Sequence, residues 1–488
     1  MSALDAVLQT SARRYPHRPA LAWDAWETTY EDLNAAVERL AARLSVVSPG
    51  QRVGILAANT PALILGMFAI WRREAVAVPL NARWREYELR ALLTDTQAIA
   101  LVSVESHRGY SFSEVLSTLL PALPTVRSCY FVDAIGELTR EVRGAGGVTP
   151  EPLDPEIGIL FYTSGTTGAP KGALVKHATP VDGAEAANRV LGATPEDVVV
   201  LVIPISHAFG LMTLVAALAA GSFAVLVDST FSTGPMLEAL ERRQGTILHG
   251  SPALFSSFQE GAPKCLSLRA GFVAGAICPA RILEQLDGAG LRVLNLYGMT
   301  ELGAVTCCRF GDSPRIRYTT AGRRLPGYEL RVAGGDGEIQ VRGPYVTPGY
   351  YLQPEQTADA LDDGWFRTGD LGSLDEDGNL SISGRAKEVI HVGGMNVFPA
   401  EVEGFLTTHP DVLQAAVVGI PHQTMGEVPQ AFVVPRPDSH VTPLELLRFA
   451  RAQIAGYKLP YKIHFLPELP MLPSGKPDRV SLARSVRE

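Results

Sequence analysis

Strand-like and helix-like segments alternate through the first 300 residues of this 488-residue chain. Residues 30–44 place apolar side chains at helical spacing, and residues 52–57 follow as a short apolar strand. The alternation continues with helices expected at 62–71 and 86–94, and with strands expected at 75–79, 99–102, 198–203, 224–228, 246–249, 271–274 and 293–296. Strands separated by helices form parallel sheets that are covered on both faces. The pattern therefore predicts an α/β fold whose ligands bind at the carboxyl ends of the strands.

The sequence changes character after about residue 320. Turn signals rich in glycine and aspartate separate short strands expected at 338–342 and 380–383, which predicts a compact β subdomain over about 320–386. A new α+β unit is expected to begin beyond Lys387. Its helices are expected at 400–407 and 443–454, and its strands at 412–420 and 430–435.

Composition and charge argue against several classes of protein. Apolar residues make up 46% and charged residues 19%, which is typical of a compact globular protein rather than a disordered one. The net charge of −8, without a basic run, argues against a nucleic-acid partner. Five cysteines without a C-x-x-C pair favour a reducing compartment and no structural metal.

Neither a membrane span nor a signal peptide is expected. The apolar run 198–227 is interrupted by Pro204, Ser206 and His207, so it is predicted to form strand, loop and core helix. The first residues lack a basic segment followed by an apolar one. We therefore expect a cytoplasmic protein.

The segment 163–172, TSGTTGAPKG, follows the apolar run 157–162 and is the most informative motif in the chain. Glycine lets backbone N–H groups crowd around a phosphate, hydroxyl groups add donors or metal contacts, and a lysine supplies a mobile charge. The spacing differs from the Walker pattern. A loop without chemistry is the alternative. The expected phosphate-binding residues are Thr163, Ser164, Gly165, Thr166, Thr167, Gly168 and Lys171.

Four further motifs carry polar residues at strand ends or turns. Residues 295–301, NLYGMTE, combine an amide, an aromatic ring, a hydroxyl and a carboxylate, which suits a nucleotide base and its magnesium. Residues 365–370, WFRTGD, place Asp370 after a turn, where a carboxylate can accept hydrogen bonds from ribose hydroxyls. Residues 384–388, GRAKE, offer Arg385, and residues 473–479, PSGKPDR, offer Lys476. Taken singly, each has a plainer reading as a turn, a charged linker or an exposed tail.

In this order, the five motifs resemble the ANL superfamily of adenylate-forming enzymes, which comprises acyl-CoA synthetases, adenylation domains and luciferases. The resemblance covers essentially the whole chain. It implies a large N-terminal domain at residues 1–386, built of αβα subdomains and the β subdomain, and a small mobile C-terminal domain at residues 387–488. It also implies two half-reactions. A carboxylate attacks the α-phosphorus of MgATP to give acyl-AMP and pyrophosphate, and a thiol then takes the acyl group.

The resemblance assigns a role to each motif in the N-terminal region. Residues 163–171 would wrap the β- and γ-phosphates, with Thr163 as a second metal contact. Asn295 and Tyr297 would hold adenine, Thr300 would contact the α-phosphate, Glu301 would ligate Mg²⁺, and Asp370 and Arg385 would grip the ribose.

Three features of the C-terminal region would control the two half-reactions. Lys476 would bridge the substrate carboxylate and the phosphate, because a cation between two anions offsets their repulsion. Lys387 would be the hinge, and rotation there would withdraw Lys476 and bring Gly393 and Gly394 to the thiol tunnel. Glycine suits a tunnel because a narrow pantetheine arm passes close to the backbone. This is a domain-alternation mechanism.

The acyl pocket is expected in segments 207–212, 249–252, 274–276 and 302–306, which contain no charged residue. An unpaired buried charge is costly, which disfavours amino acids and dicarboxylates as substrates. His207 would gate or line the pocket, and His249 would offer a polar group or cap a strand. Small residues, Gly250 among them, predict a roomy pocket for an aryl, alicyclic or medium-chain acid. The expected pocket residues are His207, Phe209, Gly210, His249, Gly275, Ala276, Gly303 and Ala304.

Two acceptor thiols fit the sequence. Residues 207–210 and Lys387 look like those of CoA synthetases, which makes coenzyme A the first expectation. The ending SGKPDR at 474–479 leans toward adenylation domains, so a carrier-protein phosphopantetheine is the second. Lys458 would either reach CoA phosphates or be a solvated surface group.

A luciferase-like oxidation and a catalytically inactive nucleotide-binding protein are the remaining alternatives. Lys476, Glu301 and Asp370 argue against the inactive protein, because nucleotide binding alone does not need that whole set.

Overall fold

The computed structural model describes residues 2–164, 170–228, 233–257, 267–275, 277–278, 280–334, 337–385, 390–397, 399–406, 408–436, 439–470 and 478–486. The chain separates into two compact units. The first unit comprises Met1–Ala82, Leu92–Tyr162 and Gly172–Gly384, and the second comprises Arg83–Ala91, Thr163–Lys171 and Arg385–Glu488.

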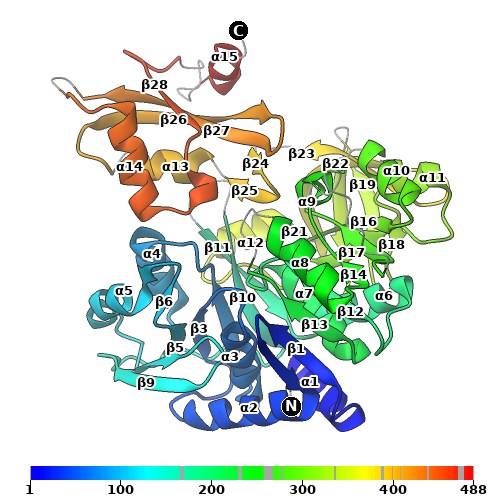
Figure 1. The fold of residues 1–488 in the computed structure, drawn as a ribbon. Helices are drawn as coiled ribbons and strands as arrows, with labels where there is room; N and C mark the ends of the chain where they lie inside the picture. The colour runs from blue at the N-terminus through cyan, green and yellow to red at the C-terminus, as the bar shows by residue number, and fades with distance from the viewer. Residues whose placement is uncertain are drawn as a thin grey trace. The chain divides into compact units, whose positions relative to one another are not determined.

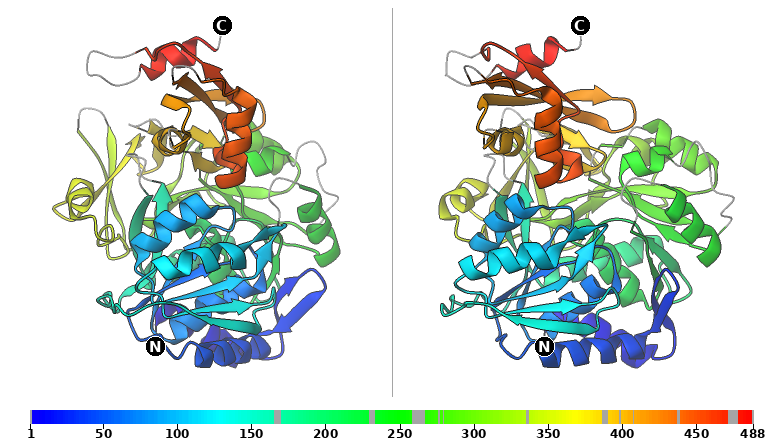
Figure 2. Two further views of the ribbon diagram at one scale, coloured as in Figure 1. Left: turned by 90° about the vertical axis from the view of Figure 1, so that its left-hand side faces the viewer. Right: turned by 60° about the vertical axis from the view of Figure 1, so that its left-hand side comes forward.

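A seven-stranded sheet forms one part of the first unit, with strand order β11-β10-β4-β3-β5-β8-β9 (Figure 1). Its central strands are parallel, and β9 pairs antiparallel to β8 at one edge. The helix α5 covers one face of this sheet at β5 (Figure 2). The strands are β3 Arg52–Leu56, β4 Val76–Leu80, β5 Ala100–Val104, β8 Ser128–Val132, β9 Leu138–Arg143, β10 Ile157–Ser164 and β11 Pro170–Lys176. The short hairpin β6 Ser106–His107 and β7 Tyr110–Ser111, α5 Phe112–Leu119 and the 3₁₀ turn Leu120–Ala122 complete this region. The helix α4 (Glu86–Thr96) begins in the second unit and ends in the first.

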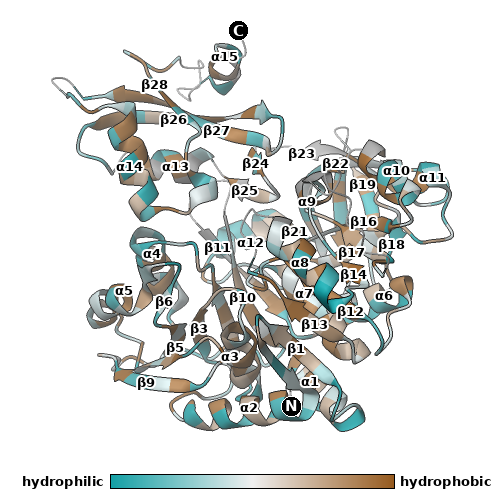
Figure 3. Cartoon of the chain, viewed as in Figure 1, coloured by the Kyte–Doolittle hydropathy of each residue, from teal (hydrophilic) through white to brown (hydrophobic). Residues whose placement is uncertain are grey.

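The helices near this sheet show two kinds of apolar pattern. In α2 (Tyr30–Arg43) the buried residues recur every three or four positions, and the Thr29 side chain caps the helix by accepting the Asp32 N–H. In α3 (Pro61–Arg72) every residue up to Trp71 is buried, so this helix is apolar all round (Figure 3). The first is a surface helix and the second a core helix, as their patterns indicate.

A nine-stranded sheet forms a second part of the first unit, with order β18-β17-β16-β15-β14-β12-β13-β1-β2. The strands from β16 to β1 are parallel, and antiparallel strands close both edges. The strands are β1 Pro19–Trp23, β2 Trp26–Thr29, β12 Val198–Leu201, β13 Phe223–Leu226, β14 Ile247–Leu248, β15 Ala270–Val273, β16 Arg292–Met299, β17 Gly303–Cys307 and β18 Arg323–Arg324. The helices are α1 Ala3–Arg14, α6 Ala178–Leu191, α7 Ala208–Ala220, α8 Thr233–Arg243, α9 Pro252–Ser257, α10 Ala280–Gly288 and α11 Pro314–Thr319.

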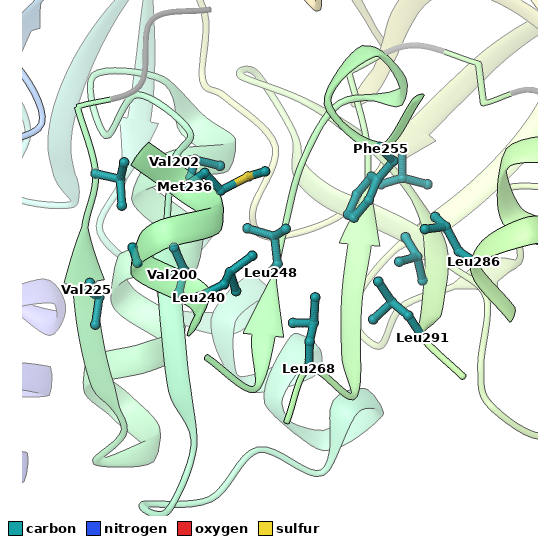
Figure 4. Packing of buried hydrophobic residues seen from close by; sticks show 14 of the residues in the cluster. Val200, Val202, Val225, Met236, Leu240, Leu248, Phe255, Leu268, Leu286 and Leu291 are labelled. Atoms are coloured by element: carbon teal, nitrogen blue, oxygen red, sulfur yellow. The ribbon is translucent and has the colours of Figure 1, made fainter. Parts of the chain in front are cut away.

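Buried apolar side chains hold α8 and α10 against this sheet. Met236 and Leu240 of α8 pack with Val200 and Leu248 on the strands, in one cluster with Leu286 of α10 (Figure 4). Burying such side chains removes apolar surface from water, which is the main stabilising contribution in the folding of a sheet-and-helix layer.

A five-stranded sheet follows along the chain, with β19 Glu329–Ala333, β20 Glu338–Arg342, β21 Leu361–Asp362, β22 Trp365–Leu374 and β23 Leu380–Arg385. The registers among β19 to β22 are antiparallel. The helix α12 (Pro354–Ala360) lies between β20 and β21 in sequence.

The second unit contains another five-stranded sheet, built on the long antiparallel hairpin of β26 and β27. The strand β28 adds parallel to β27, and β24, which forms a short antiparallel hairpin with β25, also pairs with β27. The strands are β24 Ile390–Val392, β25 Met395–Val397, β26 Val412–His422, β27 Gly426–Pro435 and β28 Lys462–Phe465. The helices are α13 Pro399–Leu406, α14 Pro443–Gln453, α15 Arg479–Arg484 and the 3₁₀ turn Gly456–Lys458.

The α/β fold class predicted from the alternation of segments is confirmed. The run 198–227 forms β12, a loop, α7 and β13, as expected from its interruptions. None of the helices that the structure describes combines the length and the apolar character needed to cross a bilayer.

Candidate active site

Asn295 lies in the middle of β16, at the last position where this strand pairs with β15. The Asn295 side chain donates both amide hydrogens to backbone carbonyls, those of Arg317 and Thr320, each at 3.0 Å. Its carbonyl oxygen, an acceptor, is therefore the atom that this side chain can offer a ligand. The two bonds also tie α11 and the residue after it to β16.

Tyr297 and Asp370 meet although 73 positions separate them in the sequence. The Tyr297 hydroxyl donates to Asp370 Oδ2 at 2.9 Å. The Asp370 side chain is buried, with the residue 5% exposed, and its backbone N–H donates to Thr368 Oγ1 at 3.0 Å. The contact joins β16 of the nine-stranded sheet to β22 of the five-stranded sheet. Two predicted nucleotide-site residues therefore lie together, and their ligand roles remain predictions.

Glu301 follows directly after the half-buried Thr300 and is itself only 7% exposed. Its Oε1 accepts a hydrogen bond of 2.9 Å from the Tyr350 hydroxyl, and its backbone carbonyl accepts one of 2.7 Å from the Thr347 N–H. Burial first, and then the neighbouring Glu301 carboxylate, raise the pKa of Tyr350 far above its usual value. Sequence reasoning missed Tyr350, because no spacing signal links two residues 49 positions apart.

The donor set at Glu301 fits the metal that the resemblance implies. Mg²⁺ is usually held by one or two carboxylates together with substrate phosphates, and it keeps several waters. Within the described ranges no three His, Cys, Asp or Glu side chains gather into a metal-binding group. The single buried carboxylate of Glu301 is therefore compatible with a Mg²⁺ ion that substrate phosphates and water also hold.

His207 is the N-cap residue of α7, and the loop before it is tightly held. The His207 N–H donates to the Pro204 carbonyl at 3.0 Å. The Asn59 side chain donates to the Ile203 carbonyl and accepts from the Ile205 N–H, both at 2.8 Å. Asn59 was missed because an asparagine just before a helix reads in a sequence as a local turn or cap.

Gly210 has a structural reason that differs from the expected one. A Cβ at this position would lie 2.2 Å from the Pro204 carbonyl oxygen and 3.0 Å from the Ile203 oxygen. The close backbone approach gives Gly210 a structural reason to be glycine, and its place in the acyl pocket remains a prediction.

The other small residues of the expected pocket differ in how much space surrounds them. A Cβ on Gly303 would meet Thr179 Cγ2 at 2.7 Å, and one on Gly250 would meet Leu254 Cδ2 at 2.8 Å. Ala304 is itself buried, at 4% exposure. Gly275 differs, since a Cβ there would have no atom within 4 Å, although its φ of +89° disfavours other residues.

His249 caps a strand. Its Nδ1 accepts the Phe272 N–H at 3.0 Å, and its ring stacks on that of Phe272 with centroids 5.4 Å apart. The Phe209 ring approaches from the other segment, with centroids 6.0 Å apart and an interplanar angle of 62°. Burial lowers the pKa of His249 to about 3, so the ring is neutral at pH 7 and carries its hydrogen on Nε2. The bond to the Phe272 N–H favours a structural role in holding β15, and the polar contact with a substrate remains a prediction.

Gly393 and Gly394 form the two-residue turn between β24 and β25 in the second unit. Their φ angles are +56° and +81°, as a type I′ hairpin turn requires. The need for two glycines is thus explained by the local turn, and the proposed contact with a thiol arm remains a prediction.

Lys458 is not a solvated surface group, so that expectation is wrong. Its side chain is 5% exposed and pairs with Glu88 at 3.5 Å, where both residues belong to the second unit. Its Nζ also lies 5.9 Å from the Trp84 ring centroid and 5.8 Å from that of Tyr457. The ammonium group is therefore held by one carboxylate and two aromatic faces.

The structure describes only part of the predicted phosphate-binding, hinge and bridging residues. Lys171 is described, and it is half-buried in β11. Thr163 and Ser164 lie in β10 and Arg385 in β23, but their side chains are outside what the structure describes. Gly165, Thr166, Thr167, Gly168, Ala276, the hinge Lys387 and the bridging Lys476 lie outside the described residues and stay predictions.

The fold and this geometry define a class of protein, an α/β protein with a second α+β unit and with two buried carboxylates, Glu301 and Asp370, near β16. Comparison with protein families gives the identity within that class. The chain belongs to the AMP-binding enzyme family, whose model matches residues 8–351, and the model of the AMP-binding enzyme C-terminal domain matches residues 401–476.

Similar proteins cover almost the whole chain. A CoA ligase of Rhodococcus jostii (strain RHA1), named for a methyl-dioxo-octahydro-indenyl propanoyl group, is 32% identical over 498 residues, with 96% of each chain covered. A feruloyl-CoA synthase of Amycolatopsis is 33% identical over 488 residues, with 95% of each covered. A solved structure of o-succinylbenzoate CoA synthetase from Bacillus subtilis, a double mutant bound to a product analogue, is 28% identical, with a TM-score of 0.84 and 98% of each chain covered.

The resemblance to the ANL superfamily is confirmed by these matches. The chain is an ATP-dependent acyl-CoA ligase that acts through an acyl-adenylate and uses Mg²⁺ and coenzyme A.

Proposed function

We propose that this enzyme activates a bulky hydrophobic carboxylic acid, of aryl, alicyclic or medium-chain type, and transfers its acyl group to coenzyme A. The observation that carries the acid class is the neutral character of the pocket segments, which contain no charged residue and in which burial keeps His249 uncharged at pH 7. A second carboxylate or an ammonium group would find no partner of opposite charge in those segments. The relatives named for feruloyl and bicyclic propanoyl groups act on acids of this kind.

The nucleotide is proposed to lie at the contact of Tyr297 with Asp370. Asn295 would accept a hydrogen bond from the adenine amino group, since both of its own amide hydrogens are engaged. Asp370 would accept bonds from the ribose hydroxyls. Glu301 would hold Mg²⁺, which when bound neutralises phosphate charge near the reacting phosphorus.

The remaining roles are proposed for the phosphate-binding segment, Arg385, the hinge and the bridging lysine. Residues 163–171 and Arg385 would hold the phosphates and ribose, with Thr163 as a second metal contact. Lys476 would offset the repulsion between the substrate carboxylate and the α-phosphate, after which rotation at Lys387 would remove it for thioester formation. This sequence uses one face of the C-terminal domain for each half-reaction.

Pyrophosphate release measured against a panel of carboxylic acids, with and without CoA, tests the proposal. The panel contains aryl and alicyclic acids, medium-chain straight acids, α-amino acids and dicarboxylates. We expect acyl-CoA, identified by mass spectrometry, from the neutral hydrophobic acids. Preferential turnover of amino acids or dicarboxylates would contradict the acid class.

A carrier-protein phosphopantetheine is the second acceptor proposed, on the strength of the ending SGKPDR at 474–479. Accumulation of acyl-AMP in the presence of CoA would favour it. We also propose a cytoplasmic location, supported by Cys129, Cys278, Cys307 and Cys308, the described cysteines, which are buried and form no disulfide, since thiols persist in a reducing compartment.

A further inference from the structure

Tyr350 contacts the Glu301 carboxylate. Its hydroxyl donates to Glu301 Oε1 at 2.9 Å, and the Glu301 residue is 7% exposed. A hydrogen bond of this kind to a buried carboxylate restricts the rotamer of the side chain.

The backbone around Tyr350 is firmly mounted. The Leu174 N–H donates to the Gly349 carbonyl at 3.1 Å, and the Tyr351 N–H donates to the Gly172 carbonyl at 2.7 Å. Between these bonds Tyr350 pairs with Ala173 of β11. The Tyr350 N–H itself donates to Thr357 Oγ1 at 2.9 Å. The tyrosine is therefore attached to a sheet strand and to α12, which gives its hydroxyl a fixed position.

A hydroxyl donor placed at one carboxylate oxygen suits a metal ligand, because outer partners of this kind fix the direction of the ligating group.

We propose that Tyr350 is a positioning residue that orients the Glu301 carboxylate for Mg²⁺ bound with ATP. The inference rests on the proposed role of Glu301 as the metal ligand. Tyr350 would contact neither the substrate nor the metal, and it would act only by holding the rotamer of Glu301.

The Tyr350→Phe variant tests this, because it removes one hydroxyl and keeps the ring. Mn²⁺ replaces Mg²⁺ as a probe, and its binding to the enzyme with a non-hydrolysable ATP analogue is followed by electron paramagnetic resonance. We expect the Mn²⁺ dissociation constant to rise about tenfold or more. The Mg²⁺ concentration for half-maximal pyrophosphate release should rise in parallel, while the KM for the acid and nucleotide binding in excess EDTA stay unchanged.

Two further variants separate the possible outcomes. Tyr351→Phe is the matched control, since the Tyr351 hydroxyl donates to Gln97 Oε1 at 3.0 Å rather than to Glu301, and its Mn²⁺ affinity should equal that of the natural enzyme. Glu301→Gln should weaken Mn²⁺ binding more than Tyr350→Phe does. If Glu301→Gln weakens binding and Tyr350→Phe does not, the positioning role is refuted while the metal ligand stands. If neither variant changes Mn²⁺ affinity, the metal role of Glu301 fails, and the positioning role fails with it.

Discussion

The Gly210→Ala change shows how a position expected to shape the acyl pocket is governed by backbone packing. The added Cβ would lie 2.2 Å from the Pro204 carbonyl oxygen and 2.6 Å from the carbon of that carbonyl. A carbon and a carbonyl oxygen rest at about 3.3 Å or more, so the two segments must separate by about 1 Å. Both contacts are backbone, so no side chain can rotate away. Overpacking of this kind costs about 1–3 kcal/mol.

The displacement would also reach His207, because the Pro204 carbonyl accepts the His207 N–H. We expect urea unfolding to show a free energy of unfolding lower by about 2 kcal/mol. We further expect kcat/KM, measured by pyrophosphate release, to fall by a similar factor for small and large acids. These two measurements need only the purified variant and the acid panel.

An open pocket at Gly210 predicts a different result. In that case the Gly210→Ala variant would keep its stability, and the loss in kcat/KM would grow with the size of the acid, which would refute the packing argument. Gly288→Ala at the end of α10 is the matched control, since its Cβ would have no atom within 4 Å. Its free energy of unfolding should rise slightly, by up to about 1 kcal/mol.

Three further expectations concern the same region. Tyr297→Phe removes the hydroxyl that donates to the buried Asp370 carboxylate, and the loss of such a partner costs about 1–3 kcal/mol. Because Asp370 is the proposed ribose contact, the KM for ATP in pyrophosphate exchange should rise about tenfold. The KM for the acid should not change. Asn59→Leu removes both bonds to the loop before His207, so kcat should fall and the free energy of unfolding should drop by about 2 kcal/mol in urea titrations; an unchanged kcat would separate the loop from catalysis. The pKa of His249 is about 3 in the folded protein and 6.5 when unperturbed, so the unfolded state binds the extra proton as pH falls below 6.5 and the fold loses about 1.4 kcal/mol per pH unit. Urea titrations at pH 7.5 and 5 should show a smaller loss in a His249→Asn variant, and an equal loss would contradict this assignment.

Local sequence signals were sufficient for most elements of the fold. The expected helix at 30–44 is α2, Tyr30–Arg43, because its apolar residues recur at helical spacing and Thr29 caps its start. The expected strand at 412–420 is β26, Val412–His422. Periodicity and capping act over a few residues, so the order of residues alone carries this information.

Contacts between distant segments were not available from such signals. Tyr350 could not be assigned to Glu301, nor Lys458 to Glu88, because these pairs depend on sheet register and on the course of loops. The close approach of the Pro204 carbonyl to Gly210 could not be predicted either, because it depends on the course of the loop before α7.

The sequence by itself determined the alternation of strands and helices, the order of the five motifs and hence the adenylating class, since each depends on residues close together in the chain. The tertiary structure decided which side chain orients the Glu301 carboxylate, which hydroxyl meets Asp370 and why Gly210 is glycine. The physical reason is that hydrogen bonds and close packing act over a few ångströms in space, and the fold alone brings residues 49 or 73 positions apart within that distance.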